Sequence, residues 1–149
     1  MGSSYSAATT SPFDLADQQR VRLLAGIERL EHALSRPVAE RDWRHLVADG
    51  LTELGSAFAD HVSTTEGTDG LYAQLLDPAP RLARGVYVLT REHAPLTRAI
   101  DAVRQRVPGT DPDDLRIRAG DVLRELSRHR QRGADLVYEA YQTDIGGET

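Results

Sequence analysis

The chain has 149 residues, which is long enough for one domain with a buried core. It contains no cysteine, so disulfides, thiolate metal sites and thiol nucleophiles are excluded. A net charge of −5 argues against nucleic acid as a partner, and no apolar run approaches the length of a membrane span. The N-terminus lacks a charged-then-apolar signal pattern, so we expect a cytoplasmic protein that binds neither nucleic acid nor membrane.

The first part of the chain predicts a polar leader followed by a helix. Residues 1–12 are small and polar, and we interpret them as a disordered leader before a folded domain over residues 13–147. The first helix is expected to open at Asp14 and to end before Pro37. Apolar residues recur along it at helical spacing: Val21, Leu23, Leu24, Ile27, Leu30 and Leu34.

A second helix is expected from about Glu40 to about Glu66, where Gly67 and Gly70 end it. A short turn of helix over residues 71–76 should follow. One side of the second helix carries its large apolar residues together with a histidine: Trp43, Val47, Leu51, Leu54, Phe58 and His61.

The rest of the chain predicts two more long helices. One runs from about Arg81 to Val107, with Pro95 interrupting its hydrogen-bond ladder. The other begins after a cap at Asp111 or Thr110 and continues to the tail at residues 144–147. Nothing alternates with period two for long enough to form a sheet. Four long helices with short links predict an all-α, up-down-up-down four-helix bundle.

Three histidines lie in the apolar stripes of three successive long helices. His61 continues the stripe of the second helix, His93 lies between two leucines of the third, and His129 does so on the fourth. A buried imidazole needs a partner, and three together suggest a shared metal site, with separate hydrogen-bonded core histidines as the alternative that stays open. His32 lies nearly opposite the stripe of the first helix, so it is only a weak candidate ligand, and His45 is interpreted as a surface residue.

Carboxylates are missing where a dinuclear site in a helical bundle would need them. Such a site places a carboxylate four residues after a histidine, on the same helix face. Here these two positions are Thr65 and Gly133. Glu66 follows His61 by five residues and reaches the site only if the helix unwinds near Gly67. Glu92 precedes His93 and points about 100° away from it, so both acids are secondary candidates.

The sequence resembles the hemerythrin-like (HHE cation-binding) family, in a divergent bacterial, actinobacterial-type form, over about residues 14–147. The motifs that carry the resemblance are "TEGTDGLY" after His61, the Glu92-His93 pair, and "RHRQRGADLVYEAY" around His129. The family implies a four-helix bundle that binds non-haem iron and senses or handles oxygen, reactive species or iron. His61, His93 and His129 match family ligand positions.

The bridging positions depart from the family pattern, because Thr65 and Gly133 are not carboxylates. His32 is also out of register with the core. The sequence therefore favours a mononuclear iron or zinc site over a standard di-iron centre. Its expected ligands are the three histidines, with Glu66 as a candidate fourth. Small diatomic or reactive species are the expected partners at an open coordination position.

Two further functions stay open at this point. A metal-free bundle would act as an interaction module, binding a partner or a second copy of itself through the aromatic segment "LVYEAY" at residues 136–141. Alternatively, the small Thr65 and Gly133 would leave room between helices for haem, held by one of the histidines. No residue is placed as a clear general acid or base, so an enzyme is not predicted. Tyr72, Tyr87 and Tyr138 are candidate hydrogen-bond donors near the site, although packing with the hydroxyl at the surface is the favoured expectation.

Overall fold

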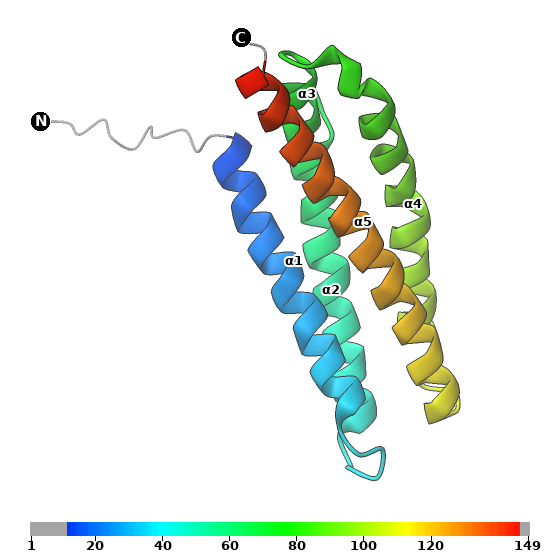
Figure 1. The fold of residues 1–149 in the computed structure, drawn as a ribbon. Coiled ribbons are helices and arrows are strands. Elements are labelled where there is room, and N and C mark those ends of the chain that lie inside the picture. The colour runs from blue at the N-terminus through cyan, green and yellow to red at the C-terminus, as the bar shows by residue number, and fades with distance from the viewer. Residues whose placement is uncertain (1–11, 147–149) are drawn as a thin grey trace, which may run out of the picture.

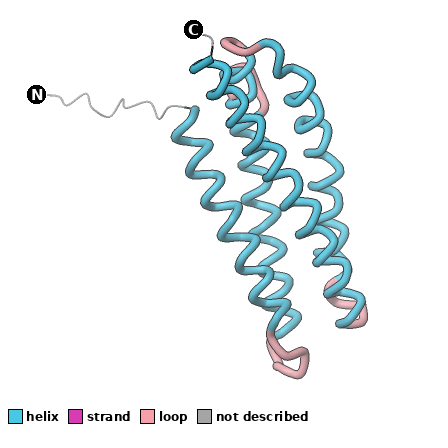
Figure 2. Tube along the Cα trace, viewed as in Figure 1, coloured by secondary structure: helices cyan, strands magenta, loops and turns pink. Residues whose placement is uncertain are grey.

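The computed structural model describes residues 12–146 and is all-helical over that range. Its elements are α1 (Pro12–Ser35), α2 (Trp43–Thr65), α3 (Leu71–Leu76), the 3-10 turn η2 (Pro80–Leu82), α4 (Ala83–Arg106) and α5 (Pro112–Gly146). Figure 1 shows the four long helices side by side. Figure 2 shows the loops gathered at the two ends of the molecule, with no strand in the described range. The prediction of an all-α chain is confirmed.

Local sequence explains most helix boundaries, with three differences from the prediction. Residues 37–42 form turns rather than helix, because Pro37 restrains the backbone and the amide of Glu40 donates to the Pro37 carbonyl at 3.1 Å, so α2 begins at Trp43. The third long helix starts later than expected, after the 3-10 turn that Pro80 opens. The predicted leader, residues 1–12, lies outside the described residues except for Pro12, which begins α1.

The cap of α5 is the predicted one. The backbone N–H of Asp113 donates to Oδ2 of Asp111 at 3.1 Å, and Asp113 and Asp114 place negative charge in the first turn. α4 continues through Pro95 without a break in its helical assignment.

Two buried apolar clusters fill the interior, and the histidines lie between them. The larger cluster joins all four long helices and includes Phe58, Leu96 and Leu126. The smaller one joins α3, η2, α4 and α5 and includes Leu89 and Leu136. His93 therefore separates leucines of the two clusters on α4, and His129 does so on α5. The tertiary structure thus forms one polar layer across an otherwise apolar core.

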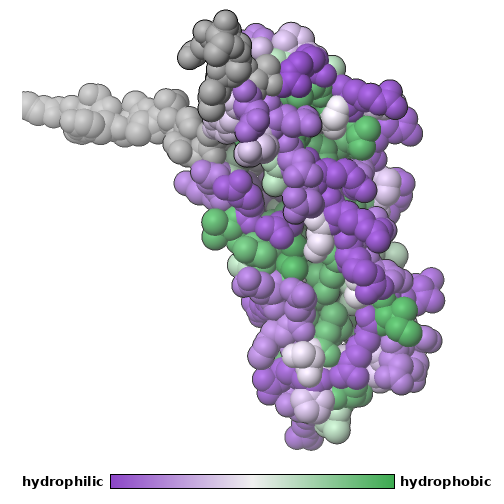
Figure 3. Space-filling view, in the orientation of Figure 1, coloured by the Kyte–Doolittle hydropathy of each residue, from purple (hydrophilic) through white to green (hydrophobic). Residues whose placement is uncertain are grey.

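The buried stripe of α1 is narrower than predicted. Leu23, Ile27 and Leu30 are buried, but Val21 is 69% exposed and Leu24 is 38% exposed. Leu23, Ile27 and Leu30 belong to the larger buried cluster, whereas Val21 and Leu24 lie on the solvent side. Figure 3 shows a hydrophobic band on the face that α1 and α5 form. Within residues 12–146, no helix is both long and apolar enough to cross a membrane.

Candidate metal centre

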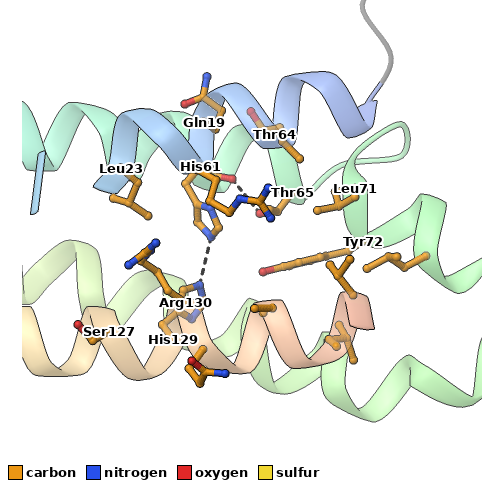
Figure 4. Close-up of a pocket in the computed structure, with 18 residues that line it drawn as sticks. Gln19, Leu23, His61, Thr64, Thr65, Leu71, Tyr72, Ser127, His129 and Arg130 are labelled. Atoms are coloured by element: carbon orange, nitrogen blue, oxygen red, sulfur yellow. Dashed lines mark hydrogen bonds between the residues drawn. The ribbon is translucent and has the colours of Figure 1, made fainter. Parts of the chain in front are cut away.

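The three predicted histidines come together in the polar layer. Each of His61, His93 and His129 offers a ring nitrogen, and these atoms all lie within 4.8 Å of one another. His93 and His129 are buried, at 3% and 2% exposure, and His61 is partly buried. The Nε2 atoms of His61 and His129 are 3.1 Å apart (Figure 4). The prediction that these side chains share one site in the bundle is confirmed.

Phe58 forms one wall of this cluster. Its ring stacks on His61 with centroids 5.5 Å apart, and it meets His93 and His129 edge-on at 5.8 and 5.9 Å. Phe58 appears in the sequence only as a core residue of the second helix. Because it precedes His61 by three residues, it lies on the same helix face, and that spacing is the signal that links it to the site.

Glu66 reaches the cluster because α2 ends in front of it. Thr65 is the last residue of α2, and Glu66 has extended backbone with ψ of 168°. Gly67 follows at φ of 101°, a left-handed conformation that glycine adopts without strain. This exit turns the carboxylate toward α4, where the Nδ1–H of His93 donates to Oε2 of Glu66 at 3.0 Å. The structure thus supplies the unwinding on which the prediction for Glu66 depended.

Glu92 also contacts a histidine, but not its sequence neighbour. The Nδ1–H of His129 on α5 donates to Oε1 of Glu92 on α4 at 2.7 Å. Arg132 donates to the other carboxylate oxygen of Glu92 at 2.6 Å. Glu66 and Glu92 therefore both contact the outer edges of the rings, whereas the Nε2 atoms face the interior. This arrangement fixes the tautomer and the orientation of the His93 and His129 rings.

Tyr72 lies inside the site, contrary to the prediction of a surface hydroxyl. Its side chain is buried, its ring stacks on His93, and its hydroxyl lies 3.4 Å from Nε2 of His93. With the His93 proton on Nδ1, the Tyr72 O–H is the donor and Nε2 is the acceptor. Burial raises the pKa of Tyr72, so the phenol stays protonated at neutral pH. The prediction holds for Tyr87 and Tyr138, which are exposed.

Burial also favours the neutral form of His61 and of His129, which is the form that binds metal. Removal from water, together with the smaller effects of the neighbouring His129 and His93, lowers the pKa of His61 to about 3. The pKa of His129 is lowered by the same burial, although its hydrogen bond to Glu92 acts in the opposite direction. At ordinary pH, neutral His61 and neutral His129 therefore each carry one N–H and one nitrogen lone pair on the ring.

His32 is not brought to the site. It is exposed near the end of α1, and the Ser35 hydroxyl donates to its backbone carbonyl. The α1 residues beside the histidines are instead Gln19, Arg20 and Leu23. These residues lie about three turns before His32. The reason is that the first part of α1, and not its last part, packs beside the end of α2 that carries His61. His45 is exposed, as predicted.

Neither predicted bridging position supplies a carboxylate or a free hydroxyl. Thr65 is buried, and its hydroxyl donates to the backbone carbonyl of His61 at 2.9 Å. Gly133 has open space where a Cβ would lie. Both residues line a cavity of about 330 Å³ that also borders His61, His129 and Tyr72 (Figure 4). The prediction of a pocket next to Thr65 and Gly133 is confirmed.

Comparison with protein-family models, with curated proteins and with solved structures found nothing that matches this chain. The interpretation of the site therefore depends on its own geometry and on the motifs in the sequence.

Proposed function

We propose that this chain is a hemerythrin-like, up-down-up-down four-helix bundle that binds one iron ion through His61, His93 and His129. The observation that carries the proposal is the convergence of three imidazoles in a buried layer, two of them oriented by carboxylates. Three imidazoles suit iron and zinc alike, and the family resemblance favours iron. Its role would be to sense or handle oxygen, reactive species or iron itself.

The residues present fit a metal ion. Two nitrogens bonded to one tetrahedral metal ion lie about 3.3 Å apart, given metal–nitrogen bonds of about 2.0–2.1 Å. The Nε2 atoms of His61 and His129 are 3.1 Å apart. Without a metal, His129 carries its proton on Nδ1, so the Nε2–H of His61 must donate to it. When the proton of His61 moves to Nδ1, the Nε2 atom of His61 has a free lone pair. All three histidines then direct a lone pair into the cluster.

The arrangement of the acids favours one metal ion over two. Glu66 and Glu92 contact Nδ1 atoms, on the side of each ring away from the inward nitrogens. Thr65 donates to its own helix, and Gly133 has no side chain. Among the residues whose side chains the structure describes, no carboxylate is therefore placed to bridge a second ion.

Bound iron would supply redox chemistry and an open coordination position for a small molecule. The chain's own residues prepare that position. Phe58 closes one wall, and Tyr72, as a protonated phenol, directs a hydrogen-bond donor at the cluster. The cavity beside Thr65 and Gly133 provides access for a small ligand. The carboxylates of Glu66 and Glu92 hold the Nδ1 protons, which makes the inward nitrogens better donors.

The test is metal loading of the purified chain, followed by elemental analysis. We expect one iron per chain under anaerobic loading, and one cobalt with visible absorption typical of nitrogen ligands. His129→Ala should abolish loading, whereas His32→Ala, the matched control at an exposed histidine, should not. Two irons per chain with oxo-bridge absorption would contradict the mononuclear site. No metal at all, or a Soret band with haem in its place, would contradict the proposal as a whole.

A further inference from the structure

The cavity beside the histidines is lined by an arginine, Arg130, for which no acid partner lies among the residues whose side chains the structure describes. Arg130 lies on α5 next to His129 and is half-buried. Its Nε atom is buried and has no hydrogen-bond partner. An arginine stays charged under all ordinary conditions, so it cannot avoid the cost of burial by losing its proton. A buried N–H donor without a hydrogen-bond partner costs free energy, so an acceptor that reached Arg130 from the cavity would be stabilising.

The other partly buried arginines all have partners. Arg36 pairs with Glu40, Arg44 donates to the carbonyls of Val107 and Thr110, and Arg116 donates to those of Leu34 and Arg36. Arg130 alone combines partial burial with no hydrogen bond or ion pair to any residue whose side chain the structure describes. The nearby carboxylates are already engaged, since Glu66 accepts from His93 and Glu92 accepts from His129 and Arg132.

The cavity also has an apolar part among polar lining residues. This part includes Leu71 and Leu75 of α3 and Leu136 and Val137 of α5. Figure 4 shows Arg130 on one side of the His61–His129 pair, with Tyr72 and Leu71 on the other side. The volume of about 330 Å³ is at the small end of the range for organic ligands, and it exceeds what a diatomic molecule needs.

We propose that this cavity binds a small organic acid, with the carboxylate on Arg130 and the apolar body between the leucines of α3 and α5. A carboxylate matches the planar donor pair of a guanidinium and neutralises its charge. The apolar body of the ligand then covers the apolar side chains that line the cavity. The ligand would lie against His61 and His129, beside the proposed metal position. This inference goes beyond the proposed function and does not depend on it, because Arg130 and the leucines need no metal to bind the acid.

The experiment is calorimetric titration with sodium octanoate, performed on chelator-treated protein and on cobalt-loaded protein. We expect binding to both forms, with 1-octanol and octylammonium at least tenfold weaker. Binding only to the cobalt form would contradict an acid site independent of the metal. Failure of metal loading would leave the metal-free titration unaffected, so the two proposals fail separately.

Two variant pairs sharpen the test. Arg130→Gln should weaken octanoate binding at least tenfold, whereas Arg118→Gln removes an exposed, unpaired charge from the same helix and should change nothing. Gly133→Leu should fill the cavity and weaken binding to a similar degree, whereas Gly120→Leu, outside the cavity, should not. Far-ultraviolet circular dichroism checks that each variant is folded. Equal binding of octanoate by Arg130→Gln, equal binding of octanol by the parent protein, or no binding of octanoate at millimolar concentration would overturn the proposal.

Discussion

The carboxylate of Glu92 on α4 lies 2.7 Å from Nδ1 of His129 on α5, although Glu92 is adjacent in sequence to a different histidine of the same cluster. The neighbouring His93 is oriented instead by Glu66, from the end of α2. Each of these two histidines is therefore oriented by a helix other than its own. The site is held together by cross-helix pairs, and it depends on the packing of α2, α4 and α5.

Replacing Glu92 by Gln should weaken metal binding by about 10- to 100-fold, as loss of a partner that orients a ligand commonly does. The amide cannot supply the negative charge that makes His129 a strong donor. Affinity is measured by competition with a chelator, using cobalt or zinc. Glu125→Gln is the matched control, because Glu125 is an exposed acid that pairs with Arg128. Unchanged affinity in Glu92→Gln would show that the contact has no role in metal binding.

The metal-free protein should lose stability as the pH falls from about 6.5 toward 3. The pKa of His61 is lowered from 6.5 to about 3, chiefly by burial, so over this interval the unfolded chain binds a proton that the folded chain does not. The free energy of unfolding then falls with decreasing pH, by at most about 1.4 kcal/mol per pH unit for this one group. His129, whose pKa is also lowered, acts in the same direction.

Urea denaturation at pH 7 and at pH 5, in the presence of a chelator, measures this effect. His61→Gln should show a shallower dependence on pH than the parent protein. His45→Gln, at an exposed histidine, should leave the dependence unchanged. An identical slope in the parent protein and in His61→Gln would mean that His61 is not held neutral by the fold.

Gly70→Ala should disturb the path of Glu66. A Cβ at position 70 would lie 2.6 Å from the backbone carbonyl oxygen of Thr65 and closer still to that of Glu66, so the backbone must shift. We expect a loss of about 1–3 kcal/mol in the free energy of unfolding, the usual cost of overpacking. Metal affinity should also weaken, because Glu66 moves away from His93. Gly109→Ala, where a Cβ meets open space, should leave both unchanged.

Gly133→Glu should strengthen metal binding. Position 133 is one turn after His129, on the same face, and a side chain there enters the cavity without a clash. A carboxylate would add a fourth protein ligand, and we expect an increase in affinity of about tenfold or the appearance of a second ion. Gly133→Gln separates the effect of charge from that of size. If the Glu and Gln variants bind metal equally, position 133 does not face the metal.

Periodicity alone was sufficient to predict the helices and the inward direction of the histidines. Leu89, His93 and Leu96 follow helical spacing, as do Leu126 and His129, and a helix has one buried face. The same local rule predicted that His32 and His45 point to solvent. These features depend on residues three or four positions apart, which a regular helix places on the same face.

The partners of the histidines were decided by tertiary structure. Glu66 reaches His93 because α2 ends at Thr65 and the chain turns at Gly67, and Glu92 reaches His129 because α4 packs on α5. Tyr72 is buried because α3 folds over the end of the bundle. The position of Arg130 at the cavity, where its Nε has no partner among the described residues, also results from the packing of the helices. No spacing along one helix encodes these contacts, since each depends on the rotation and register of one helix against another.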